Sequence, residues 1–164
     1  MHLHRLTALT GVVIGVVGLF FSGLSTEGEA ALPALSSQSD SFPDGIPTIW
    51  GGLDGWAQVL LVILIIAVVA IAFMPERTET YDRNMAMVTS VIGVALLAYA
   101  IVKALDASDS ADTLQAGFAQ AAAAGVPGVV AWGVSVNVGF FVLMLGTVVV
   151  ALGGAMSLLT TSED

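Results

Sequence analysis

The sequence predicts an all-α integral membrane protein with four transmembrane helices and a short extracytoplasmic surface helix. Hydrophobic residues make up 57% of the 164-residue chain and charged residues only 10%. Soluble domains carry roughly 25% charged residues, so this chain has too few to cover a water-exposed surface. Its apolar residues also gather in long runs, which lipid solvates well. Residues 1–164 are therefore expected to form a single four-helix membrane domain.

Four uninterrupted apolar runs give the predicted transmembrane helices. None of them contains Asp, Glu, Lys, Arg or His. Helices are expected because every backbone polar group in lipid needs an internal partner, and the runs lack the alternation of barrel strands. The fourth run extends from about Val129 to Leu159. It exceeds the bilayer thickness, so this helix should tilt or project. The predicted spans are residues 6–24, 57–74, 85–102 and about 131–157.

The segments between the runs differ in composition. Residues 25–56 are rich in Ser, Gly, Pro and Asp and are expected to form a loop, whereas residues 75–84 are a short charged connection. Residues 103–128 contain the stretch LQAGFAQAAAAG, whose alanines favour helix. This stretch is predicted to form the surface helix. Asp106 and the acidic and Ser residues that follow it are expected to cap that helix rather than to bind a cation.

Lys and Arg are distributed unequally between the two sides of the predicted bundle. Arg5, Arg77 and Arg83 fall on one side and Lys103 on the other. Because cytoplasmic connections carry the excess of Lys and Arg, both termini are predicted to be cytoplasmic. The two long connections are then extracytoplasmic. Abundant Ala, Gly and Val with scarce Lys is typical of GC-rich bacterial genes and points to a bacterial cell (inner) membrane.

Three tryptophans fall near the extracytoplasmic ends of the predicted spans: Trp50, Trp56 and Trp132. The indole ring is apolar while its N–H needs a polar partner, so Trp favours the membrane–water interface. We predict that these side chains anchor the helices at that interface.

Small residues recur at helical spacing in three of the runs. In the first run they are separated by four, three and four positions, and in the fourth run glycines recur every seven positions. Small residues let helix backbones approach closely in lipid, where no hydrophobic effect draws helices together. These faces are predicted either to pack the four helices on each other or to dock onto another membrane subunit. The residues are Gly11, Gly15, Gly18 and Ser22 in the first run, Gly93 in the third, and Ser135, Gly139, Gly146 and Gly153 in the fourth.

Asn137 is the one strongly polar side chain predicted to lie deep in a span. A buried amide in lipid stabilises helix association by hydrogen bonding to a neighbouring helix. We expect this role for Asn137, with a place in a substrate path as the alternative.

The composition excludes several kinds of chemistry. Without Cys the chain has no thiolate ligand and no disulfide. Its spans lack the ionisable groups that ion-coupled transporters use. The only histidines are His2 and His4, which are expected in a solvated terminus, so no cofactor and no metal site is predicted. The net charge of −9 gives no attraction for nucleic acid.

These observations favour a non-catalytic accessory, assembly or scaffold subunit of a larger bacterial membrane complex, with a respiratory-chain complex as one candidate host. Its expected partners are the lipid bilayer and other membrane subunits. The alternative is a small homo-oligomeric transporter or channel with a pore lined by Gly, Ser, Thr and Asn137. A lipid-modifying enzyme that uses the extracytoplasmic Asp residues is a weaker hypothesis, because the sequence offers no acid–base pair or nucleophile.

Overall fold

A computed structural model describes residues 1–74 and 78–160 of the chain. The protein is mostly helical, and α3, α4 and α5 are each long and apolar enough to cross a membrane. The shorter α1 is also apolar. Arg77, which entered the prediction of the orientation, lies outside the described residues. In chain order the elements are α1 (Leu3–Leu19), β1 (Leu24–Thr26), the 3-10 turn η1 (Glu29–Ala31), α2 (Leu32–Ser36), α3 (Gly55–Ala72), α4 (Arg83–Ala123), β2 (Val134–Val136) and α5 (Gly139–Thr160).

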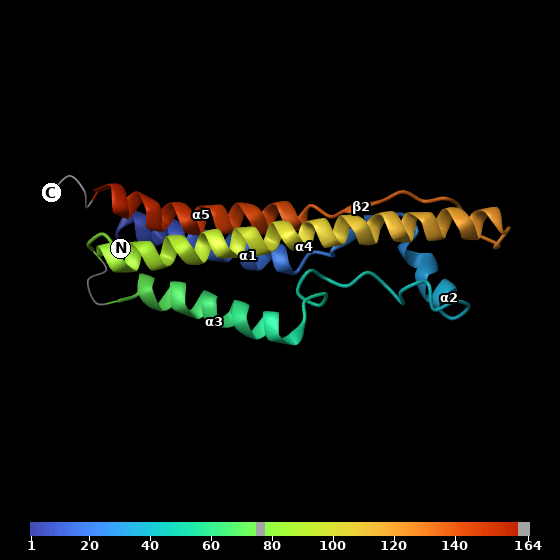
Figure 1. The fold of residues 1–164 in the computed structure, drawn as a ribbon, viewed down its shortest axis with the longest axis horizontal. Coiled ribbons are helices and arrows are strands. Elements are labelled where there is room, and N and C mark those ends of the chain that lie inside the picture. Colours follow the sequence, from blue (N-terminus) through green and yellow to red (C-terminus); the bar gives the residue numbers. More distant parts are fainter. Residues whose placement is uncertain (75–77, 161–164) are drawn as a thin grey trace.

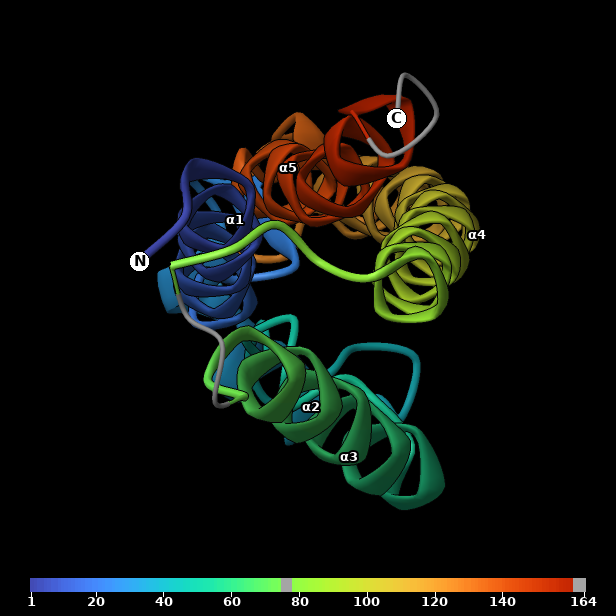
Figure 2. The ribbon, with the colours of Figure 1, turned by 90° about the vertical axis from the view of Figure 1, so that its left-hand side faces the viewer.

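The long helices run side by side in an elongated molecule, with α5 between α1 and α4 (Figures 1 and 2). The start of α1 and the end of α5 lie at the same end of this bundle. The helix α3 lies beside the layer of the other three and contacts it sparsely. Apolar side chains from all four helices meet between them, among them Ala8, Leu61, Val68, Ile92, Phe140 and Val150.

The helix α4 continues without a break through the stretch that was predicted to be a separate surface helix. It has 41 residues, which at 1.5 Å per residue is about 61 Å, roughly twice the hydrocarbon thickness. The prediction of a separate helix was wrong because nothing between Lys103 and Leu114 interrupts helical geometry: that segment contains neither Gly nor Pro. The polar side chains that begin at Lys103 change the character of the helix surface, and they do not mark where the helix ends.

The fourth apolar run was predicted to be one helix, and its first part is instead extended. The strand β2 pairs antiparallel with β1, and Ser135 lies opposite Ser25. The helix α5 begins only at Gly139. The first part of the run is rich in Val and is interrupted by Gly133, a composition that favours extended structure over helix. The first run also ends early as a helix, because α1 stops at Leu19 and Leu24 belongs to β1.

The projecting half of α4 is covered by the long loops. We refer to residues 24–53, 103–123 and 124–136 together as the cap, which extends from the bundle at the end opposite to the start of α1 (Figure 1). Its core contains Leu32, Leu35, Leu114 and Phe118. The ring of Trp132 meets that of Phe118 edge-on, with 5.2 Å between the ring centroids.

Candidate functional site

The predicted small residues of α1 and α5 lie against each other in one seam. A Cβ at Gly11 would be 2.5 Å from the backbone nitrogen of Val150, and one at Gly18 would be 2.7 Å from the nitrogen of Leu143. Gly146 lies directly against the backbone of Gly15. Real Cβ atoms do not approach backbone so closely, so the spacing of α1 and α5 depends on the lack of a side chain at Gly11, Gly18 and Gly146.

Further glycines extend this seam and form a second one. Gly139 faces Phe21 at one end of α5, and Gly153 faces Ala8 at the other. On the opposite side of α5, a Cβ at Gly93 of α4 would lie 2.5 Å from the nitrogen of Ala151. The helix α5 is therefore packed closely on both sides. The sequence pattern did not assign these contacts to particular helix pairs.

Three of the predicted packing residues do not lie in helices. Ser22 follows α1 and forms an isolated β-bridge with Thr48, and Ser135 lies in β2. Asn137 precedes α5, where its side-chain oxygen accepts a hydrogen bond of 3.2 Å from the backbone N–H of Gly139. The prediction that Asn137 lies deep in a span was wrong, because the helix that was to carry it starts two residues later.

The tryptophans occupy three different environments. The side chain of Trp56 lies in the first turn of α3 and is 64% exposed. The side chain of Trp50 is half-buried against the bundle core, and its backbone N–H donates to the carbonyl of Leu19. Trp132 packs in the cap core on Phe118. Interface anchoring therefore remains a prediction for Trp50 and Trp56, while Trp132 lies outside α5 altogether.

At the end of the bundle away from the cap, Arg5 is almost completely buried. Its guanidinium donates hydrogen bonds of 3.1–3.4 Å to carbonyls at the C-terminal end of α3 and in the connection that follows. A cation at this position is favourable because unpaired carbonyls give a helix C-terminus partial negative charge. The sequence located Arg5 only as a charge near the membrane surface. The carbonyls belong to Ile71, Ala72, Met74, Glu79 and Thr80.

Two neighbouring side chains complete this buried polar end. The ring of Tyr81 lies under Arg5, with 5.1 Å between the guanidinium carbon and the ring centroid. Burial raises the pKa of the Tyr81 hydroxyl, and the guanidinium of Arg5 partly opposes that shift. His4 is also buried and lies 3.0 Å from the hydroxyl of Ser157 on α5. The expectation of a solvated His4 was therefore wrong, because α1 already begins at Leu3 and carries the ring into the bundle.

The helix α3 is fixed at its two ends more than along its length. At its start, Gln58 donates to the carbonyls of Trp50 and Leu53. At its end, Arg5 binds the last carbonyls. Between these ends most side chains point away from the rest of the protein, and only a narrow stripe is buried. The buried residues are Ala57, Leu61, Val68 and Ala72.

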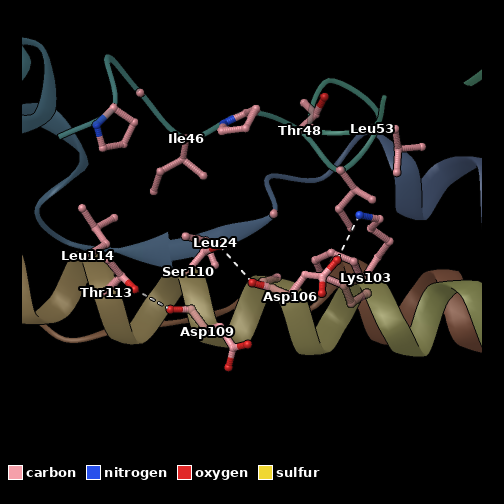
Figure 3. Close-up of a pocket in the computed structure, with 18 of the residues that line it drawn as sticks. Leu24, Ile46, Thr48, Leu53, Lys103, Asp106, Asp109, Ser110, Thr113 and Leu114 are labelled. Carbon is pink, nitrogen blue, oxygen red and sulfur yellow. Dashed lines mark hydrogen bonds and ion pairs between the residues drawn. The ribbon is translucent and has the colours of Figure 1, made fainter. Parts of the chain in front are cut away.

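A cavity of about 560 Å³ lies where the bundle meets the cap. One wall is α4, beginning at Lys103, and the opposite wall is the loop of residues 41–53 (Figure 3). Leu24 of β1 and Phe140 in the first turn of α5 also line the cavity. The volume lies within the 300–1,000 Å³ range roughly typical of small-molecule sites.

The polar groups of this cavity belong mainly to α4. Lys103 and Asp106 form an ion pair of 2.9 Å. The hydroxyl of Ser110 donates to the backbone carbonyl of Asp106, and that of Thr113 to the carbonyl of Asp109. The carboxylate of Asp109 points to the side of α4 away from the loop (Figure 3). The cavity is therefore lined by the ion pair of Lys103 and Asp106 and by a second acidic residue, Asp109. The side chain of Ile46 extends into the cavity from the loop.

No protein-family model, curated protein or solved structure significantly matches this chain. Within residues 1–74 and 78–160, no group of three or more His, Cys, Asp or Glu side chains is placed to hold a metal ion.

Proposed function

We propose that this protein is a non-catalytic accessory or scaffold subunit of a larger membrane protein complex. The observation that carries the proposal is the way α3 is held. A buried Arg5 and a hydrogen-bonded Gln58 fix the two ends of this helix, although its own packing on the bundle is sparse. A helix held in place by its ends keeps a long apolar face free for contact with another membrane helix.

The free face of α3 is continuous and apolar. Its most exposed large side chains are between 42% and 64% exposed, and they lie between Trp56 and Ile66 in the first two thirds of the helix. The small-residue faces of α1, α4 and α5 are by contrast occupied by each other. These exposed residues are Trp56, Val59, Leu60, Val62, Ile63 and Ile66.

We propose four spans for the protein in the membrane, with α1 as the fourth. It has 17 residues, about 26 Å of helix, and it lies along α5 for its whole length. Arg5 and Arg83 lie at one end of the bundle, so the excess of positive charge favours cytoplasmic termini and an extracytoplasmic cap. A bacterial inner membrane remains the expected location.

The alternative of a transporter or channel has less support. It required a pore lined by Gly, Ser, Thr and Asn137, yet the glycines of α1 and α5 lie in helix–helix seams and Asn137 precedes α5. We therefore do not propose it.

The proposal is tested by purifying the tagged chain in a gentle detergent and identifying what co-purifies by mass spectrometry. A stoichiometric membrane partner is expected, and Ile63→Trp on α3 should release it. Val13→Trp on α1 is the matched control, because Val13 is similarly exposed, 62% against 56% for Ile63. The proposal would be contradicted if the wild-type chain purified without a partner, or if the two variants lost the partner equally.

A further inference from the structure

The loop that forms one wall of the cavity at the junction of bundle and cap is attached to the rest of the protein near both of its ends. It is attached near one end by Phe42, whose ring lies 5.8 Å from that of Phe118 in α4. Near the other end, the carbonyl of Pro47 accepts a hydrogen bond from the N–H of Gly23, and the N–H of Ile49 donates to the carbonyl of Phe21. Between these attachments the loop stands away from α4, so the space is framed on both sides.

The cavity lies at the level where the apolar runs of α3 and α4 meet polar sequence. Lys103 is the first charged residue after the apolar run of α4, and Leu53 lies just before α3 begins. Large apolar side chains around this junction are exposed: Phe20 is 68%, Leu105 63% and Phe141 65% exposed. Such side chains are typical of the boundary between hydrocarbon and headgroups. A ligand that reaches the cavity from the adjoining leaflet is therefore lipid-like.

The charges of the cavity indicate which headgroup fits. Lys103 is the only Lys or Arg of the cap, and it is paired with Asp106. Both side chains are partly exposed, 28% and 57% respectively. Exposed ion pairs are weak and open readily. A zwitterionic headgroup offers a phosphate to the ammonium of Lys103 and an ammonium to the carboxylate of Asp106. An anionic headgroup satisfies only Lys103 and leaves Asp106 unpaired.

We propose that this cavity is a binding site for a zwitterionic phospholipid of the adjoining leaflet, with its headgroup at Lys103 and Asp106. Part of its apolar chain lies against Leu24, Ile46 and Phe140. The acidic surroundings add selectivity, because Asp109 in the cavity lining, Asp44 in the loop and Asp54 just before α3 disfavour an additional anion. This inference rests on the proposed membrane placement of the helices and is independent of the accessory role.

Native mass spectrometry of the full chain in detergent tests the proposal, with phosphatidylethanolamine and phosphatidylglycerol of identical acyl chains as the added lipids. We expect one retained phosphatidylethanolamine, bound about fivefold more than phosphatidylglycerol. Ser110→Phe, which fills the cavity, should abolish this preference. Ser108→Phe is the control, because Ser108 is likewise exposed on α4 but does not line the cavity. Equal retention of the two lipids by the wild-type chain would overturn the proposal, and so would equal effects of the two substitutions.

Substitutions that change charge provide a second test, because they do not add a large side chain as Ser110→Phe does. Asp106→Asn removes the carboxylate and leaves Lys103 unpaired, so the preference should shift towards phosphatidylglycerol. Lys103→Gln should weaken the binding of both lipids. An unchanged preference in Asp106→Asn would overturn the assignment of the headgroup site.

Discussion

The guanidinium of Arg5 in α1 lies over the ring of Tyr81, 5.1 Å from its centroid, just before α4 begins. Through this contact and its hydrogen bonds to the end of α3, one side chain connects three helices. The positive charge is buried without a carboxylate partner among the described residues, and backbone carbonyls and an aromatic face surround it instead.

Arg5→Gln is expected to lower the free energy of unfolding by about 2–4 kcal/mol, because the carbonyls it serves would remain buried without a donor. SDS-induced unfolding in mixed micelles, followed by far-UV circular dichroism, measures this change. Arg83→Gln removes the same charge from an exposed position at the start of α4 and should have little effect. Equal losses in the two variants would show that Arg5 does not hold α3.

The seam between α1 and α5 predicts different outcomes for two glycines on the same face of α1. Gly11→Ala should cost about 1–3 kcal/mol of stability, because the new methyl group would meet backbone atoms of α5. At Gly15 a Cβ would be 3.8 Å from the nearest atom, a methyl of Leu143, which is an ordinary contact. Gly15→Ala should therefore be neutral, or stabilising by up to about 1 kcal/mol through helix propensity. The same unfolding measurement compares them, and a larger loss for Gly15→Ala would refute this packing.

The unbroken α4 predicts where the protein leaves the membrane. Because the chain has no Cys, single cysteines can be labelled without background. Ser108→Cys and Asp112→Cys in the cap should react with a membrane-impermeant maleimide at least about tenfold faster than Val91→Cys and Val94→Cys in the bundle, because only water supports the thiolate. All four positions are exposed on the helix surface, so the difference would report lipid and not burial in protein. Equal labelling would place the membrane boundary elsewhere.

The sequence was sufficient to predict the helical character and the approximate positions of the apolar helices. Length and continuity identify a span because the bilayer imposes both. Helix spacing also identified the glycine face of α1, which does pack closely on α5. These features depend on local composition, which a single sequence displays directly.

The remaining features depend on tertiary contacts. Ser25 and Ser135 lie opposite each other in the paired strands β1 and β2, although they are far apart in the chain. An apolar run rich in Val can also be either strand or helix. Burial of Arg5 required knowing that α3 ends beside the start of α1. The cavity at Lys103 and Asp106 arises because a loop from another part of the chain crosses α4. Contacts between such distant segments leave no pattern in the local sequence.

The continuity of α4 has a mechanical consequence. Because the same helix forms the wall of the cap and one side of the bundle, no joint separates the two parts along it. A sideways load on the cap would therefore tilt the whole helix. The close packing of α4 on α5, at Gly93 against Ala151 and at Gly154 against Ser90, would resist this tilt.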